Sequence, residues 1–304
     1  MNFRLFYSLI IFFTLIGCSD SDIDSNEIEQ EITYPREFYI THNSQNRRYI
    51  FYKPKDLPEN SPLVFVLHGY TSNSNNIMNY SKMNRIAEEK GFAVCYPQGT
   101  NNEMTGMPHW NANIKPMSSV PDSDFLTQLA KLLQDQYKLS KENTFVSGMS
   151  NGGFMSYTLA CEQSGTFKAI ASVTGTMSGY DWKNCNPDYK IPILQISGTN
   201  DNTVQMDGSM STVWGWGGAP KIEDIIDYWS NINSCSSSEI INLPNNNSAD
   251  NSYVTLDKRF TSESKDDIRF YTVHGGGHDW PGAWGNMDIN ASEEIWDFFS
   301  QHLK

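Results

Sequence analysis

Short apolar runs alternate with amphipathic segments along most of this chain. Strands are predicted at residues 47–53, a stretch of mixed polarity, and at the apolar runs that follow, 62–67, 92–96, 144–148, 167–173, 191–197 and 268–273. Apolar residues at helical spacing predict helices between 77 and 90 and over 122–137, 150–161, 222–232 and 291–303. The Asn-rich stretch 242–251 predicts an exposed loop. This alternation is typical of an α/β fold with a doubly wound, mostly parallel sheet and helices on both faces.

The first 35 residues have a different character from the rest. An apolar run over 5–16 is too short to span a membrane as a helix but suits the core of a signal peptide. It ends in Leu15-Ile16-Gly17-Cys18, which resembles a bacterial lipobox. We therefore expect residues 1–17 to be a lipoprotein signal peptide and Cys18 to become a lipidated N-terminus, with an ordinary secretory signal as the alternative.

Residues 18–35 are acidic and poor in apolar side chains, so we expect a disordered tether before a single folded domain over 36–304. These features predict an exported lipoprotein at the outer membrane or cell surface of a Gram-negative bacterium, held on the membrane through Cys18. A formal net charge of −13 argues against nucleic acid or an anionic membrane surface as the main partner.

The remaining cysteines fit an exported chain in which disulfides persist. Cys95 lies in a predicted buried strand and is expected to be an inert thiol. Cys161 ends a predicted helix and Cys185 precedes the next strand, so these two are the best candidate disulfide pair. The spacing of the cysteines does not suggest a metal site.

One short stretch carries the chemistry. Gly148-Met149-Ser150-Asn151-Gly152 fits the pattern G-x-S-x-G between a predicted strand and a predicted helix, the setting of a nucleophile elbow. Asp201 and His278 follow in that order, each just beyond the carboxyl end of a predicted strand. Because such ends meet at one edge of an open α/β sheet, we expect Ser150 as nucleophile, His278 as base and Asp201 as the acid that orients the base.

Other residues are less well placed for these roles. Asp207 lies farther into the loop than Asp201. His274 ends the strand that leads to His278. Two histidines, His68 and His109, precede the serine, which is the wrong order. The other two, His42 and His302, look like surface residues. We expect His68 to shape its loop. The oxyanion would then be held by the backbone N–H groups of Asn151 and Tyr70.

Several motifs occur together in one order from residue 62 to 284. They are Leu67-His68-Gly69, Tyr96-Pro97-Gln98-Gly99, Trp110-Asn111, Asp122-Ser123-Asp124-Phe125, Gly148-Met149-Ser150-Asn151-Gly152-Gly153, Ser197-Gly198-Thr199-Asn200-Asp201 and Gly275-Gly276-Gly277-His278-Asp279-Trp280-Pro281-Gly282. In these the chain resembles the polyhydroxybutyrate depolymerase and feruloyl esterase family of secreted α/β-hydrolases, close to carbohydrate esterases that act on acetylated or feruloylated xylan. It departs from the family at Tyr70, where a Cys is frequent, and over 261–267, which has no Cys.

The resemblance implies an α/β-hydrolase fold and the same three residues, Ser150, Asp201 and His278. We expect a serine carboxylic-ester hydrolase without cofactor or metal that releases feruloyl or acetyl groups from plant cell-wall xylan. The alternatives are a polyester depolymerase, a serine peptidase and, from a different class, a glycan-binding surface lipoprotein with a vestigial site. Aromatic side chains expected to bind substrate are Trp110, Trp214, Trp216 and Trp280, with local loop packing as the alternative for 214–218.

Overall fold

A computed structural model describes residues 35–304 apart from 115–117, 210–217 and 262–264. The expected signal peptide, the lipidation site Cys18 and nearly all of the expected tether lie outside the described residues. So do Trp214 and Trp216. The described residues belong to one compact unit, Ile32–Lys304. None of the helices within them is long and apolar enough to cross a membrane.

A ten-stranded sheet forms the centre of the described fold, in the order β1-β2-β4-β3-β7-β8-β9-β12-β11-β10. The six strands from β4 to β12 are parallel, and antiparallel strands extend the sheet at both edges. The strands are β1 (Arg36–His42), β2 (Gln45–Tyr52), β3 (Leu63–Leu67), β4 (Ala93–Pro97), β7 (Thr144–Met149), β8 (Ile170–Val173), β9 (Ile193–Gly198), β10 (Ser237–Asn242), β11 (Tyr253–Phe260) and β12 (Ile268–His274). A separate small hairpin pairs β5 (Thr100–Asn101) with β6 (Pro108–His109).

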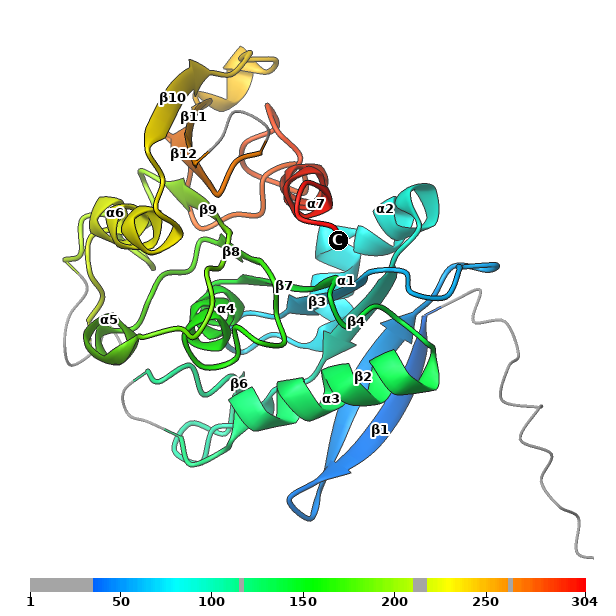
Figure 1. The fold of residues 1–304 in the computed structure, drawn as a ribbon. Coiled ribbons are helices and arrows are strands. Elements are labelled where there is room, and N and C mark those ends of the chain that lie inside the picture. Colours follow the sequence, from blue (N-terminus) through cyan, green and yellow to red (C-terminus); the bar gives the residue numbers. More distant parts are fainter. Residues whose placement is uncertain (1–34, 115–117, 210–217, 262–264) are drawn as a thin grey trace, which may run out of the picture. The chain divides into compact units, whose positions relative to one another are not determined.

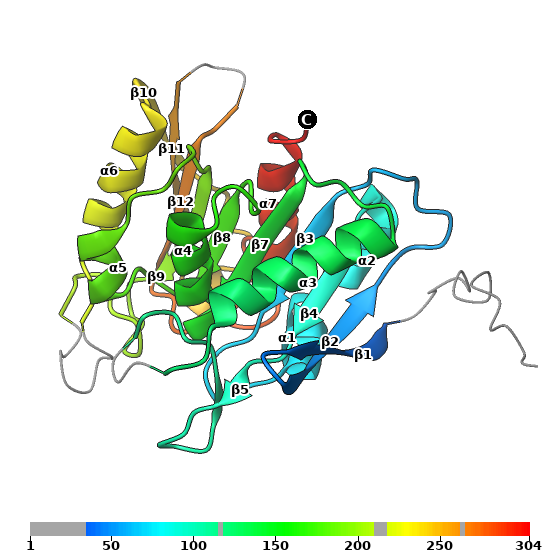
Figure 2. The ribbon, with the colours of Figure 1, turned by 60° about the horizontal axis from the view of Figure 1, so that its bottom comes forward.

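Helices cover both faces of this sheet (Figures 1 and 2). One face carries α3 (Asp122–Gln136), α4 (Asn151–Glu162) and α6 (Ile222–Asn233), with the short α5 (Gly179–Asn184) beside them. The other carries α1 (Ser74–Ser81), α2 (Met83–Lys90) and α7 (Ala291–Ser300). Alternate residues of β3 face opposite sides, since Phe65 packs in one apolar cluster and Val64 in the other. The predicted doubly wound α/β-hydrolase fold is therefore confirmed.

The structure differs from the sequence-based prediction mainly near the edges of the sheet. The edge strands β1 and β10, and β11 next to β10, were not predicted, because they bury only part of one face and lack a continuous apolar run. The Asn-rich stretch connects β10 to β11 and includes a short 3-10 turn, Ser248–Asp250. The helix predicted before Gly91 is two helices, because Lys82 adopts a left-handed conformation with φ of 48° between α1 and α2.

Two histidines expected at the surface are buried. His42 ends β1, and its Nε2 lies 2.7 Å from Oδ2 of Asp124 on α3. His302 follows α7, where Nε2 donates to the carbonyl oxygen of Asp266 at 3.0 Å, and burial lowers its pKa to about 4. Both expectations were wrong because β1 and the end of the chain pack against the domain.

The cysteine expectations can be compared with the same structure. Cys161 and Cys185, the candidate pair, are joined by a disulfide that ties the end of α4 to the end of α5. Cys95 is a buried free thiol in β4, and burial raises its pKa well above the ordinary value, which fits an inert side chain. Cys235 is also free.

Candidate active site

Ser150 occupies a sharp turn between β7 and α4. Its φ of 53° and ψ of −118° are strained for a residue with a side chain. The flanking glycines make this turn possible, because a Cβ at Gly148 would collide with the backbone of Gly152 and one at Gly152 with the backbone of Leu67. The Ser150 N–H donates to the carbonyl of Val173 at 2.9 Å, which fixes the turn against β8.

The predicted acid and base contact each other directly. His278 Nδ1 lies 2.7 Å from Oδ2 of Asp201, whose side chain is 1% exposed. The other carboxylate oxygen of Asp201 accepts from the backbone N–H groups of Thr203 and Val204, each at 2.8 Å. These bonds hold the carboxylate in one orientation, so Asp201 can orient the imidazole of His278.

The loops that carry Asp201 and His278 follow the neighbouring parallel strands β9 and β12. Their backbones are joined by the bond from the Asn200 N–H to the Gly276 carbonyl, at 2.8 Å. A Cβ at Gly198 would collide with Gly276 and Gly277, so the close approach of the two loops requires glycine there. The glycine run before His278 thus brings the histidine back to the acid.

Ser150 and His278 line the same cavity, which has a volume of about 720 Å³. Its walls come from the loop over 69–72, from α1 and from residues 283–284 after His278. In the part of the chain that the structure describes, Ser150 Oγ makes no direct hydrogen bond to His278. Catalytic hydrogen bonds are often long before substrate binds, and this geometry is compatible with proton transfer once the cavity is filled.

His68 supports the loop beside Ser150. Its Nδ1 donates to the carbonyl of Gly69 at 2.7 Å and its Nε2 accepts from the N–H of Gly99 at 3.0 Å. Burial lowers the pKa of His68 to about 4, so the ring stays neutral and keeps both bonds. A Cβ at Gly69 would lie 3.4 Å from the Cβ of Ser150, which shows how closely this loop approaches the serine. His68 therefore has the loop-shaping position that the sequence indicated.

Two residues were predicted to hold an oxyanion. Asn151 is the first residue of α4, so its N–H has no acceptor within the helix. Its side chain is fixed, since Oδ1 accepts from the Trp110 N–H at 2.7 Å and Nδ2 donates to the Trp110 carbonyl at 3.1 Å. Tyr70 lines the cavity, and its hydroxyl donates to Thr105 Oγ1 at 2.6 Å. Asn151 is thus next to Ser150 in sequence, and Tyr70 lines the same cavity as Ser150.

A family model described as "Esterase PHB depolymerase" matches residues 48–213, more than half of the chain. The chain belongs to this esterase family. The assignment confirms the family resemblance of the motifs. The match covers Ser150 and Asp201 and ends before His278.

The individual proteins that resemble this chain have low sequence identity to it. The bifunctional acetylxylan esterase/xylanase of Neocallimastix patriciarum is 25% identical over 82% of this chain and 32% of its own length. A probable feruloyl esterase C of Aspergillus terreus is 25% identical over 85% of both chains. The solved acetyl xylan esterase from Aspergillus awamori superposes with a TM-score of 0.62 over 88% of this chain and 99% of its own, at 15% identity, and so shares the fold. The chain spans only about a third of the first of these relatives.

The aromatic residues of this esterase lie differently from the prediction. Trp110 and Trp280 are each 1% exposed, so neither ring is available to stack on substrate, and this expectation is corrected. Trp110 instead donates from Nε1 to the carbonyl of His68 at 3.0 Å, beneath the loop. The aromatic side chains of the cavity wall are Tyr70, which the sequence had indicated beside the oxyanion, and Tyr80 and Trp284, which sequence reasoning missed. The position of Trp284, six residues after the catalytic histidine candidate, was the available signal.

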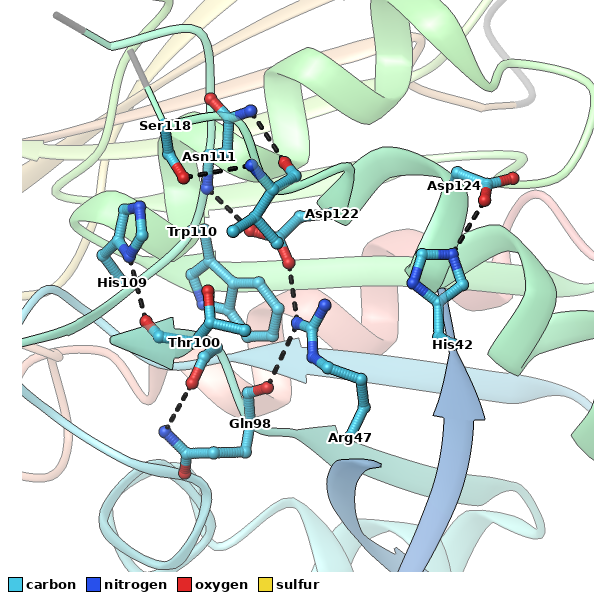
Figure 3. A network of polar contacts seen from close by, with 12 residues as sticks. His42, Arg47, Gln98, Thr100, His109, Trp110, Asn111, Ser118, Asp122 and Asp124 are labelled. Carbon is cyan, nitrogen blue, oxygen red and sulfur yellow. Dashed lines mark hydrogen bonds and ion pairs between the residues drawn. The ribbon is translucent and has the colours of Figure 1, made fainter. Parts of the chain in front are cut away.

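A buried polar network supports the segment that carries Trp110 (Figure 3). The side chains of Arg47 and Asp122 form an ion pair at 2.6 Å and are 2% and 0% exposed. Asp122 also accepts from the backbone N–H of Asn111 at 2.8 Å, immediately after Trp110. The network therefore links β2 and α3 to the residue that holds Asn151. Within the described residues, no group of three His, Cys, Asp or Glu side chains is arranged to hold a metal ion.

Proposed function

We propose that this esterase acts through a Ser150–His278–Asp201 triad and a covalent acyl-enzyme. The observation that carries the proposal is the 2.7 Å contact of His278 with the buried Asp201, made while His278 and Ser150 line one cavity. The strained backbone of Ser150 at the start of α4 also fits a nucleophile elbow.

In this mechanism Ser150 Oγ attacks the ester carbonyl while His278 Nε2 takes the hydroxyl proton. The Asp201 carboxylate accepts the hydrogen bond from Nδ1 and stabilises the imidazolium. Collapse of the tetrahedral intermediate breaks the bond to the alcohol oxygen, which receives the proton from His278. A water molecule then gives a proton to His278 and attacks the acyl carbon. Collapse of this second tetrahedral intermediate breaks the bond to Ser150 Oγ, which takes the proton back from His278 as the acid product leaves.

The backbone N–H groups of Asn151 and Tyr70 are proposed as the oxyanion donors. The N-terminus of α4 adds a favourable partial positive charge to the position beside Ser150. The fixed side chain of Asn151 and the anchored hydroxyl of Tyr70 support this role, because donors that are already oriented need no reorganisation during the reaction.

For the substrate we propose feruloyl or acetyl esters of xylan. The support comes from relatives that are named as acetylxylan and feruloyl esterases. The rates of the purified protein on methyl ferulate, acetylated xylan and polyhydroxybutyrate, measured side by side, test the choice. Turnover of the polyester alone would contradict it.

The triad is tested by Ser150→Ala, with Ser238→Ala on the exposed strand β10 as the matched control. We expect the first variant to lose hydrolysis of a chromogenic acyl ester by at least about a thousandfold, and the control to keep it. A fluorophosphonate probe should label Ser150 in the intact protein. Absence of labelling would instead favour a glycan-binding protein with a vestigial site, and near-normal turnover by Ser150→Ala would refute the mechanism.

Lipidation of Cys18 and export to the outer membrane or cell surface are a separate proposal. The apolar run over 5–16 and the sequence Leu15-Ile16-Gly17-Cys18 support it. Cells that express the full chain should incorporate labelled palmitate into the protein, and Cys18→Ser should remove the label. Equal labelling of the two proteins would contradict lipidation at this residue.

A further inference from the structure

The cavity is much larger than the smallest proposed substrate requires. Its volume of about 720 Å³ lies within the range of sites that enclose drug-sized ligands. An acetyl group has only two carbon atoms and would fill a small part of it. The rest of the cavity must therefore be explained by a larger group that lies next to the ester.

Two aromatic side chains form one wall of this space, which we call the aromatic wall (Tyr80 and Trp284). Their ring centroids are 4.3 Å apart and their planes are inclined by 78°. Trp284 is 51% exposed and lies between the exposed residues Ala283 and Gly285, whereas Trp280 in the same loop is buried. A large apolar ring left half exposed at the rim of a cavity is typical of a ligand contact.

The aromatic wall rests on buried structure. Trp280 packs behind Tyr80 in an edge-to-face contact at 6.3 Å. Its Nε1 donates to Ser292 Oγ at 3.1 Å, and Ser292 Oγ donates to the carbonyl of Ser81 at 2.6 Å. These contacts connect the loop after His278 with α1 and α7, so the wall is held in place before a ligand binds, which lowers the entropy cost of binding.

Polar side chains accompany the aromatic wall around the cavity. Ser72, Asn76 and Asn79 can donate or accept hydrogen bonds, and Lys82 adds a cation. Within the described residues Lys82 has no ion-pair partner, although the whole chain carries a net charge of −13. An apolar corner with polar groups around it suits a flat ring that carries oxygen substituents.

We propose that Tyr80 and Trp284 determine substrate specificity by binding the ring of a hydroxylated aromatic acyl group, which favours feruloyl-type esters over acetyl esters. This inference rests on the proposed function and names the acyl class for the same site. Two rings at nearly a right angle let a planar aryl group make a stacked contact with one and an edge contact with the other. A sugar ring on the alcohol side would need only one flat face.

Trp284→Ala tests the wall through selectivity. The measured quantity is the ratio of kcat/KM for methyl ferulate to kcat/KM for 4-nitrophenyl acetate. We expect this ratio to fall about tenfold in Trp284→Ala and to be largely restored in Trp284→Phe, which retains a ring. Tyr180→Ala, which removes an exposed aromatic side chain from α5, is the matched control and should keep the wild-type ratio.

A binding measurement separates the wall from the catalytic proposal. In the Ser150→Ala background, calorimetry should show that Trp284→Ala weakens methyl ferulate binding by about fivefold or more. Equal affinity, or an unchanged selectivity ratio, would overturn the role of the wall. A larger loss on acetylated xylo-oligosaccharide than on methyl ferulate would also overturn it, since the wall would then bind sugar. If the triad mechanism were refuted, the calorimetric measurement would still test the role of the wall.

Discussion

The buried ion pair between Arg47 and Asp122 offers the sharpest test of how the site is supported. Arg47→Met keeps an unbranched chain of similar length but removes the cation. Asp122 would then retain a buried charge that still accepts a hydrogen bond from the N–H of Asn111. The guanidinium also lies 3.7 Å above the ring of Phe125, a contact that Met replaces only in part.

The size of the effect follows from burial. With side chains 2% and 0% exposed, loss of one partner is expected to cost about 3–5 kcal/mol of unfolding free energy. Arg85→Met is the matched control, because Arg85 pairs with Glu89 and Glu293 while all three side chains are about half exposed. Solvent screens such pairs, and we expect the control to cost less than about 1 kcal/mol.

Urea unfolding followed by tryptophan fluorescence measures both variants. The double variant Arg47→Met/Asp122→Asn removes the unpaired charge and keeps an oxygen that can accept from Asn111, so it should recover about 2 kcal/mol of the loss. Esterase activity in the single variant should fall as well, since Trp110 next to Asn111 holds Asn151. The reasoning would be refuted if Arg47→Met cost no more than Arg85→Met, or if the double variant were less stable than the single one.

Three further predictions concern the site and its surroundings. Asp201→Asn should reduce kcat by about 10³–10⁴, because an amide favours the wrong tautomer of His278, and a loss below tenfold in ester assays would contradict this. Burial raises the pKa of Asp181 from 3.8 to about 6, so the folded chain binds this proton more tightly and the stabilisation is lost as pH rises through 6. Asp181→Asn should therefore gain about 3 kcal/mol relative to the unsubstituted protein between about pH 4 and pH 8 in urea titrations, and a constant difference would refute it. Replacement of Cys161 and Cys185 by Ser should lower the unfolding free energy by about 3 kcal/mol, since the bridge closes a loop with a sequence separation of 24; reductant should destabilise the unsubstituted protein alone.

The positions of Ser150, Asp201 and His278 were predictable from sequence for a physical reason. Each follows a short apolar strand, and glycines at 148, 152, 198 and 275–277 permit the turns and close approaches that bring the three together. The parallel order of these strands places their carboxyl ends at one edge. Local backbone conformation and strand order can both be inferred from short stretches of sequence.

The walls of the cavity were harder to predict because they depend on burial. Trp280 and Trp284 lie four residues apart in one loop, yet one is 1% and the other 51% exposed. Neither composition nor spacing distinguishes them, since burial depends on contacts with other elements, such as the hydrogen bond from Trp280 Nε1 to Ser292 Oγ on α7. The edge strand β10 and its neighbour β11 were not predicted for a related reason, since β10 is almost wholly exposed and has no apolar stripe.

The contrast between His68 and His278 shows how one side-chain type serves two roles in the same site. His68 is fully enclosed, so burial keeps it neutral, and a single tautomer donates to Gly69 and accepts from Gly99. His278 keeps 24% of its side chain exposed in the cavity and has the carboxylate of Asp201 behind it. A base must gain and lose a proton in every cycle, and a carboxylate partner stabilises the charged state that this requires. Among the residues that the structure describes, no carboxylate contacts His68, and that ring shapes the loop beside Ser150 through its bonds to Gly69 and Gly99.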